Sequence, residues 1–91
     1  MSSWQVYMIL CSDNSLYTGI SNDVERRIVQ HAGQRGAKYF RGRQPEYLVY
    51  LESGHDRSSA SQREVAIKRL RRTGKEHLIQ SELNEISAIG G

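Results

Sequence analysis

Tyr17-Thr-Gly-Ile-Ser-Asn-Asp-Val-Glu-Arg-Arg-Ile-Val-Gln-His31 is the stretch that decides the fold, because it passes from a strand into a helix. Its tyrosine and glycine end a run of strand-forming residues, and polar residues follow. Asn22 and, three residues later, Glu25 have the form of a capping box, in which each side chain satisfies a free backbone donor. The stretch therefore predicts a helix over about residues 23–33.

Two basic residues one turn apart distinguish the inward side of this helix. Val24 and Ile28 form its apolar stripe, His31 continues the stripe, and Arg27 flanks it. A single histidine or arginine in such a position is more often a hydrogen-bonded or snorkelling edge residue than a functional group. The two together would make a poor core but a suitable phosphate site, so both interpretations stay open.

The length of 91 residues suits one small domain with a single modest core. We expect this domain to span residues 1–86 and residues 87–91 to form a flexible tail. Cys11 is the single cysteine, which excludes an intramolecular disulfide framework and favours a reducing compartment. Because the chain shows neither a signal peptide nor an apolar stretch that could span a bilayer, we predict a soluble, cytoplasmic protein without a membrane partner.

Basic residues are concentrated in two tracts that contain no acid. Arg26–Arg43 contains six basic residues and Val65–Lys75 contains five, within a net charge of +3. Tyr39 and Phe40 interleave with the first tract, which suits stacking on nucleic acid but equally suits a packed aromatic pair. Solvated helix faces are the alternative explanation of each tract. As nucleic-acid-binding residues we single out Arg26, Arg35, Lys38, Tyr39, Arg41, Arg43, Lys68 and Arg71.

The N-terminal segment predicts a β-hairpin. Trp4–Leu10 is rich in strand formers, Cys11–Ser15 is turn material, and Leu16–Ile20 is a second short run. Tyr7 and Tyr17 would then lie on neighbouring strands, where both can reach one side of the sheet. Tyrosines in strands are usually packing residues with a hydrated hydroxyl, so a functional role needs a partner for those hydroxyls.

Glu64 is the acidic residue that stands out in the second half of the chain. Ser59 with Gln62 again has the form of a capping box, and a helix would follow to about Arg72. Glu64 lies within its apolar stripe, where a carboxylate is costly unless it is paired or binds a cation. An intrahelical pair with Lys68 is the structural alternative. The stripe is built from Ala60, Ile67 and Leu70.

The remaining elements complete an α/β protein with an α+β layout. Glu46–Glu52 reads as a strand, with Pro45 ahead of it and Ser53–Gly54 behind it. Thr73–Gly74 is expected to break the second helix, and a third begins at about Lys75. Its packing face would be formed by Leu78, Ile79, Leu83 and Ile86. We therefore predict a small three-stranded, mostly antiparallel sheet flanked by helices.

This combination resembles the GIY-YIG endonuclease superfamily, and within it the small stand-alone bacterial UPF0213 group. The resemblance covers about Val6–Ile79. Val6-Tyr7-Met8 stands where the first motif would lie, and Tyr17-Thr18-Gly19 where the second would. The other matching positions are Arg27, ten residues after Tyr17, then His31 and Glu64. A Tyr-x-Gly triplet is a weak signal alone, and the ordered spacing of all five positions is much stronger.

The chain departs from the superfamily pattern at two places. Gln5-Val6 replaces the Gly-Ile pair of the first motif, so only the tyrosine remains. The asparagine that follows the glutamate in several nuclease branches has no clear match, because Asn84 lies rather far downstream.

The resemblance implies hydrolysis of a phosphodiester bond in DNA with one divalent cation and no small-molecule cofactor. Glu64 would hold Mg²⁺ or Mn²⁺, hard cations that prefer oxygen ligands. Arg27 would offset the charge that develops on the phosphate. Tyr7, Tyr17 and His31 would position or deprotonate the attacking water, and which of them is the base stays open.

Three classes of function are compatible with these residues. The first is a metal-dependent endonuclease that acts on DNA structures in repair or processing. The second is a nucleic-acid-binding module that keeps the fold and the basic surface but cleaves weakly or not at all, as the degenerate first motif favours. The third is a protein-interaction domain with solubilising charges. Arg27 together with Glu64 favours the first over the second, and the two basic tracts argue against the third.

Overall fold

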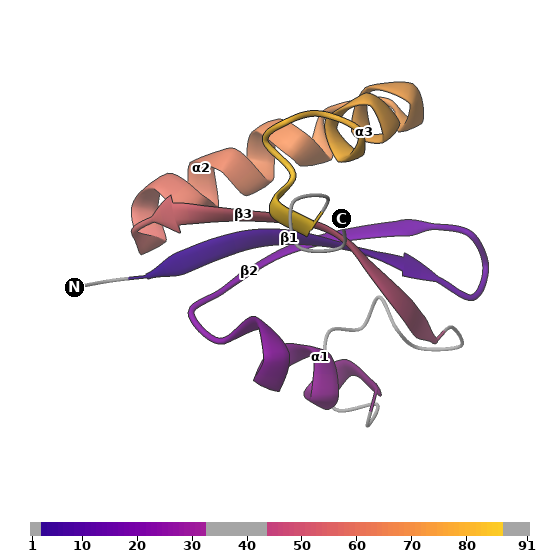
Figure 1. The fold of residues 1–91 in the computed structure, drawn as a ribbon, viewed down its shortest axis with the longest axis horizontal. Helices are drawn as coiled ribbons and strands as arrows, with labels where there is room; N and C mark the ends of the chain where they lie inside the picture. The colour runs from indigo at the N-terminus through magenta and orange to yellow at the C-terminus, as the bar shows by residue number, and fades with distance from the viewer. Residues whose placement is uncertain (1–2, 33–43, 87–91) are drawn as a thin grey trace.

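A three-stranded antiparallel sheet separates two helical layers in the computed structural model, which describes residues 3–32 and 44–86. The strand order is β2-β1-β3, and β1 pairs antiparallel with both neighbours. Helix α1 lies on one face, and α2 and α3 lie on the other (Figure 1). The elements are β1 (Trp4–Cys11), β2 (Leu16–Ser21), α1 (Val24–Ala32), β3 (Pro45–His55), α2 (Arg57–Lys68) and α3 (Arg72–Ile79). The predicted fold class and sheet are confirmed.

The β1–β2 hairpin closes through a short polar turn. The backbone N–H of Cys11 donates to the carbonyl oxygen of Ser15 over 2.9 Å. Asn14 has a φ of 67°, a left-handed conformation in which asparagine is enriched. In the resulting register Ile9 lies opposite Tyr17. Because side chains alternate along a strand, Tyr7 and Tyr17 share one face of the sheet, as predicted.

The central strand β1 is buried on both faces, because helices cover both sides of the sheet. Alternate residues of β1 therefore contribute to two separate apolar clusters. On the α1 side the buried residues are Tyr7, Ile9, Cys11 and Val24. On the side of α2 and α3 they are Val6, Met8, Tyr50, Ala60 and Ile67.

The start of α1 is capped by Asp23 and not by Asn22, so the predicted capping box was wrong. The side chain of Asp23 accepts a hydrogen bond from the backbone N–H of Arg26 over 3.2 Å. Ser21, the last residue of β2, accepts from the backbone N–H of Asp23 over 2.9 Å. Several neighbouring polar residues can cap a helix, and the path of the chain leaving the strand selects among them.

β3 continues through the residues that were expected to end it. Gly54 has a φ of +86°, a conformation that glycine adopts without strain. Trp4 pairs with His55 while Val6 pairs with Glu52, so β3 has one residue more than β1 between the two pairs. Ser53–Gly54 therefore form part of a β-bulge and do not terminate the strand.

α2 begins at Arg57, earlier than predicted, because the capping residue is Asp56. Asp56 accepts a hydrogen bond from the backbone N–H of Ser59 over 2.7 Å, and Ser59 accepts one from the backbone N–H of Asp56 over 3.1 Å. Ser59 is thus the second partner of a capping box and not its first residue, which corrects the predicted pairing with Gln62.

The break between α2 and α3 lies at Arg69–Arg71, not at Thr73–Gly74. Arg71 has extended backbone angles and is the N-cap of α3. Gly74 is inside α3, where an added Cβ would be 3.4 Å from the Cβ of Leu70. The glycine was read as a helix breaker, but it lies within the helix, and an added Cβ would make only an ordinary contact with Leu70.

The packing faces of α2 and α3 are narrower than predicted. Leu78 and Ile79 pack against the core cluster, as expected. Leu70 is 40% exposed and Leu83 is 56% exposed, so neither is a core residue. Among the described residues, no helix combines the length and apolarity that a membrane span requires.

Candidate functional site

The position of the Tyr7 ring explains why a glycine follows Tyr17 by two positions. The two residues are paired across β1 and β2, and the Tyr7 ring lies over Gly19. A Cβ at position 19 would be 2.6 Å from the Tyr7 hydroxyl oxygen, closer than side chains can approach. The rings of Tyr7 and Tyr17 have centroids 6.3 Å apart. The glycine therefore makes room for one tyrosine beside the other.

Arg27 connects α1 to this pair of tyrosines. Its guanidinium donates a hydrogen bond to the hydroxyl of Tyr7, and the Tyr7 hydroxyl bonds in turn to Tyr17. Arg27 lies in the first turns of α1, where the Asp23 cap fixes the start of the helix. The structure thus brings together three of the five predicted catalytic residues by direct contacts.

Burial dominates the acid–base properties of the tyrosines. It raises the pKa of Tyr7 to about 12; the neighbouring Tyr17 and Glu64 also raise this pKa, whereas Arg27 lowers it. Burial likewise raises the pKa of Tyr17, against the influence of Arg27. Both hydroxyls are therefore protonated at neutral pH, so either tyrosine can act as a base only if a nearby cation lowers its pKa.

Glu64 approaches the tyrosines from the opposite helical layer. Its negative charge raises the pKa of both Tyr7 and Tyr17, which places it within electrostatic range of the pair. Its carboxylate also lies 3.3 Å from the ammonium group of Lys68. The intrahelical pair of Glu64 with Lys68 is therefore present, while the charge of Glu64 also acts on the two tyrosines. The Lys68 side chain is 52% exposed, and such surface pairs contribute little stability and separate readily.

The candidate site residues come from both helical layers and from the β1–β2 side of the sheet. Tyr7 and Tyr17 lie on the face covered by α1, whereas Glu64 belongs to α2 on the other face. β2, between these two groups, is an edge strand. A ligand at this edge can meet groups from both helical layers at once.

The donor atoms at this edge suit a hard cation with a water-rich shell. Glu64 supplies a carboxylate, and Mg²⁺ commonly binds one or two carboxylates while it keeps several waters. Nowhere in residues 3–32 and 44–86 do three or more His, Cys, Asp or Glu side chains gather as a metal cluster. A cation held by Glu64 and water is thus compatible with these residues.

Thr18 is not among the residues that were predicted to belong to the site. Its hydroxyl is buried, and within the described part of the chain it has no hydrogen-bond partner. Thr18 lies opposite Met8, so its side chain projects on the α2 face of β2. Buried hydroxyls normally bind a protein group or a water. A threonine at one position of the predicted strand was the only sign of it in the sequence.

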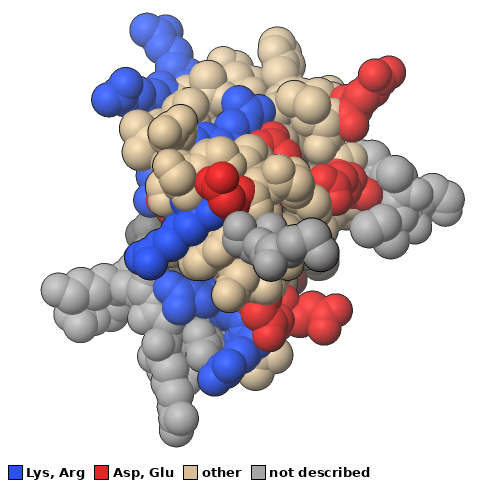
Figure 2. All heavy atoms as spheres, turned by 90° about the vertical axis from the view of Figure 1, so that its left-hand side faces the viewer, with Lys and Arg blue, Asp and Glu red and all other residues tan. Residues whose placement is uncertain are grey.

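The described basic residues of the predicted interface are exposed. Arg26 and Arg27 line a polar hollow of about 190 Å³ at the start of α1, together with Ser21–Asp23. Lys68 and Arg71 are exposed near the α2–α3 corner. Figure 2 shows Lys and Arg gathered toward one side of the face in view and Asp and Glu toward the other.

Several predicted residues lie outside the described part of the chain. The backbone of His31 is in the last turn of α1, and its side chain is not described. The other such residues are Arg35, Lys38, Tyr39, Phe40, Arg41 and Arg43. Their roles stay predictions.

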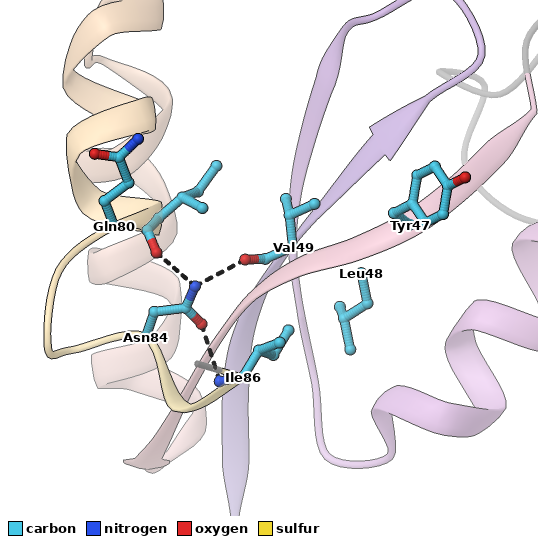
Figure 3. Close-up of a pocket in the computed structure, with 7 residues that line it drawn as sticks. Tyr47, Leu48, Val49, Gln80, Asn84 and Ile86 are labelled. Atoms are coloured by element: carbon cyan, nitrogen blue, oxygen red, sulfur yellow. Dashed lines mark hydrogen bonds between the residues drawn. The ribbon is translucent and has the colours of Figure 1, made fainter. Parts of the chain in front are cut away.

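Asn84 lies between β3 and the end of α3 and has a structural role. It is buried, and its side-chain amide donates to the carbonyl oxygens of Val49 and Ile79 over 2.8 and 2.7 Å (Figure 3). Its side-chain oxygen accepts from the backbone N–H groups of Leu51 and Ile86. Asn84 also lines an apolar hollow of about 670 Å³ beside the outer edge of β3. It therefore satisfies backbone groups of β3 and of the end of α3.

Comparisons with known proteins agree with this geometry. The profile of the GIY-YIG catalytic domain matches residues 3–77. A UPF0213 protein of Desulfotalea psychrophila is 47% identical over 88 residues, which cover 96% of this chain and 80% of that protein. A UPF0213 protein of Cronobacter sakazakii is 45% identical over 83 residues, which cover 91% and 87% of the two chains. The solution NMR structure of a UPF0213 protein from Bacillus halodurans is similar, with a TM-score of 0.57, 41% identity, and coverage of 89% and 86%.

The match to the GIY-YIG catalytic domain covers most of the chain, so the chain belongs to the GIY-YIG family, a family of nuclease domains. Within that family it belongs to the UPF0213 group. The resemblance seen in the sequence is confirmed, and membership implies nucleic-acid binding in general terms.

Proposed function

We propose that this protein hydrolyses phosphodiester bonds in DNA with one divalent cation, Mg²⁺ or Mn²⁺, held by Glu64. The observation that carries the proposal is the hydrogen-bonded group of Arg27, Tyr7 and Tyr17 within electrostatic range of Glu64. The polar hollow beside Arg27 is open to a phosphate, and the first turn of a helix adds a favourable dipole there. Action on branched or damaged DNA in repair, and a cytoplasmic location, remain predictions.

The residues of the chain divide the proposed reaction among them. Arg27 binds the scissile phosphate and stabilises the charge that develops on it. The Tyr7 hydroxyl bonds to both Arg27 and Tyr17. It thereby orients the side chain of Tyr17 relative to Arg27. Tyr7, Tyr17 or His31 holds the proton that leaves the attacking water. A cation bound by Glu64 would stabilise the leaving oxygen and lower the pKa of nearby hydroxyls.

A nucleic-acid-binding module without efficient turnover is the second candidate. Two observations favour it: Glu64 is paired with Lys68, and both tyrosines have raised pKa values. Binding by this protein would then depend on its basic residues alone. RNA is the alternative ligand for such a module.

The deciding experiment compares wild type with Glu64→Ala on labelled single-stranded, duplex, flapped and branched DNA and RNA, with Mg²⁺ or Mn²⁺. We expect cleavage to be lost in Glu64→Ala while nucleic-acid affinity stays within about twofold, because the carboxylate makes no favourable phosphate contact. Glu76→Gln, which removes an exposed acid on α3, is the control and should cleave normally. Binding by the wild type without cleavage of any substrate would establish the binding module instead.

A further inference from the structure

A hub of hydrogen bonds centred on Glu52 joins β3 to α2. The Glu52 carboxylate accepts from the Tyr50 hydroxyl over 2.5 Å and contacts the Nε2 of His55 over 2.6 Å. Nε of Arg63 donates to both carboxylate oxygens over 3.1 Å. The Glu52 side chain is 13% exposed, so this charge is largely removed from water. A partly buried carboxylate with three partners fixes the groups around it.

The hub keeps Glu52 ionised. Burial raises the pKa of its carboxyl, but hydrogen bonds from Tyr50 and His55 and the charge of Arg63 outweigh burial and lower this pKa overall. Arg63 is therefore held by a full negative charge, at a position where the side chain is only 32% exposed. Such a contact is stronger than the exposed pair of Glu64 with Lys68.

Arg63 and Glu64 occupy opposite flanks of the buried stripe of α2. Ala60 and Ile67 define the stripe, and with 3.6 residues per turn Arg63 and Glu64 lie about 50° to either side of it. α2 crosses the sheet in contact with all three strands. Arg63 lies on the flank that meets Glu52 of β3. Glu64 lies on the opposite flank, and its charge acts on Tyr7 and Tyr17.

We propose that Glu52 and Arg63 form a positioning clamp, which sets the rotation of α2 about its own axis and thereby places Glu64 beside Tyr7 and Tyr17. A rotation of about 10° would move a carboxylate 5–6 Å from the helix axis by about 1 Å. Displacements of this size are enough to impair a catalytic geometry. Ala60 and Ile67 pack α2 onto the core, and apolar packing is non-directional, so the directed Arg63–Glu52 contact on one flank of the stripe sets the final angle.

The first measurement is Mn²⁺ affinity by isothermal titration, and this part rests on the proposed function. Glu52→Gln should weaken Mn²⁺ binding by about 10–100-fold, the range for partners that orient a metal ligand. Arg63→Lys keeps the charge but loses the directed Nε contact, so it should weaken binding without changing the net charge. Glu76→Gln breaks an Arg72–Glu76 pair of the same 3.1 Å length on α3 and should leave the affinity unchanged.

The second measurement needs no metal. Residual dipolar couplings of the Cα–Hα bonds report the orientation of α2 relative to the sheet at a temperature well below unfolding. We expect α2 to rotate by about 10° or more in Glu52→Gln and in Arg63→Lys, and to keep its wild-type orientation in Glu76→Gln.

The two measurements separate the clamp from the proposed chemistry. An unchanged α2 orientation in both clamp variants would overturn the inference, whatever their Mn²⁺ affinity. Rotation of α2 with unchanged Mn²⁺ affinity would overturn it too, because Glu64 would then not depend on the clamp. If wild type binds no Mn²⁺, the proposed function fails, and rotation of α2 in the variants still supports the placement of Glu64 by the clamp.

Discussion

Tyr7 shows how one side chain can be a core residue and a site residue together. It is fully buried, yet its hydroxyl bonds to Arg27 and Tyr17 at the edge of the sheet. Gly19 allows this arrangement because a side chain at that position would occupy the space of the Tyr7 hydroxyl. The spacing between the tyrosines and the glycine is thus a packing requirement as well as a family motif.

The raised pKa of Tyr7 predicts a loss of stability in alkali. Above pH 10 the unfolded chain releases the Tyr7 proton while the folded chain keeps it, so the free energy of unfolding falls as pH rises toward the folded-state pKa of about 12. The contribution is fully present below pH 10, and about 1 kcal/mol of it is lost by pH 11.

The Tyr7→Phe variant has no titrating group at this position. Its free energy of unfolding should therefore fall less between pH 8 and pH 11 than that of wild type. Urea denaturation of wild type and Tyr7→Phe at pH 8 and pH 11 measures it, because the groups that do not contact Tyr7 contribute equally to both proteins. If the free energy of unfolding falls equally in the two proteins, the pKa of Tyr7 is not raised by burial.

At the scale of elements, the helix caps and strand ends differ from those that the sequence pattern indicated. Asp23 and Asp56 cap α1 and α2, whereas the sequence pattern pointed to Asn22 and Ser59. The existence and order of strands and helices follow from local periodicity, and this part of the prediction was right. The boundaries were wrong by a few residues, because several polar residues near each end could serve as caps.

Asn84→Ala should destabilise the protein without affecting the site at β2. Loss of its side chain leaves buried backbone groups of β3 and α3 without partners, at a cost of about 1–3 kcal/mol. Thermal and urea unfolding would measure the change, and Mn²⁺ affinity at 15 °C should equal that of wild type. A variant as stable as wild type but inactive would instead make Asn84 a catalytic residue.

At the scale of the whole molecule, binding of a polyanion should depend strongly on salt. Arg26 and Arg71 belong to different basic tracts, and both are exposed. If each contacts one phosphate, Arg26→Ala and Arg71→Ala should each reduce the slope of log K against log salt by about one.

Arg57→Ala is the matched control for this measurement. Arg57 lies over the Trp4 ring at 5.8 Å, at the start of α2, and is not among the predicted contacts. Fluorescence anisotropy with labelled DNA at several salt concentrations gives the slopes. An equal reduction in all three variants would indicate a diffuse charge effect and no defined binding face.

The sequence by itself determined the hairpin, the order of helices and strands, and the family, because periodicity and the spacing from Tyr7 to Glu64 are properties of the chain. Only the tertiary structure decided that Tyr7 lies over Gly19 and that Glu64 is within range of the tyrosines as well as paired with Lys68. It also made Asn84 a structural residue and assembled the hub at Glu52. These contacts join residues far apart in the sequence, and they depend on how each helix packs on the sheet, which no local pattern encodes.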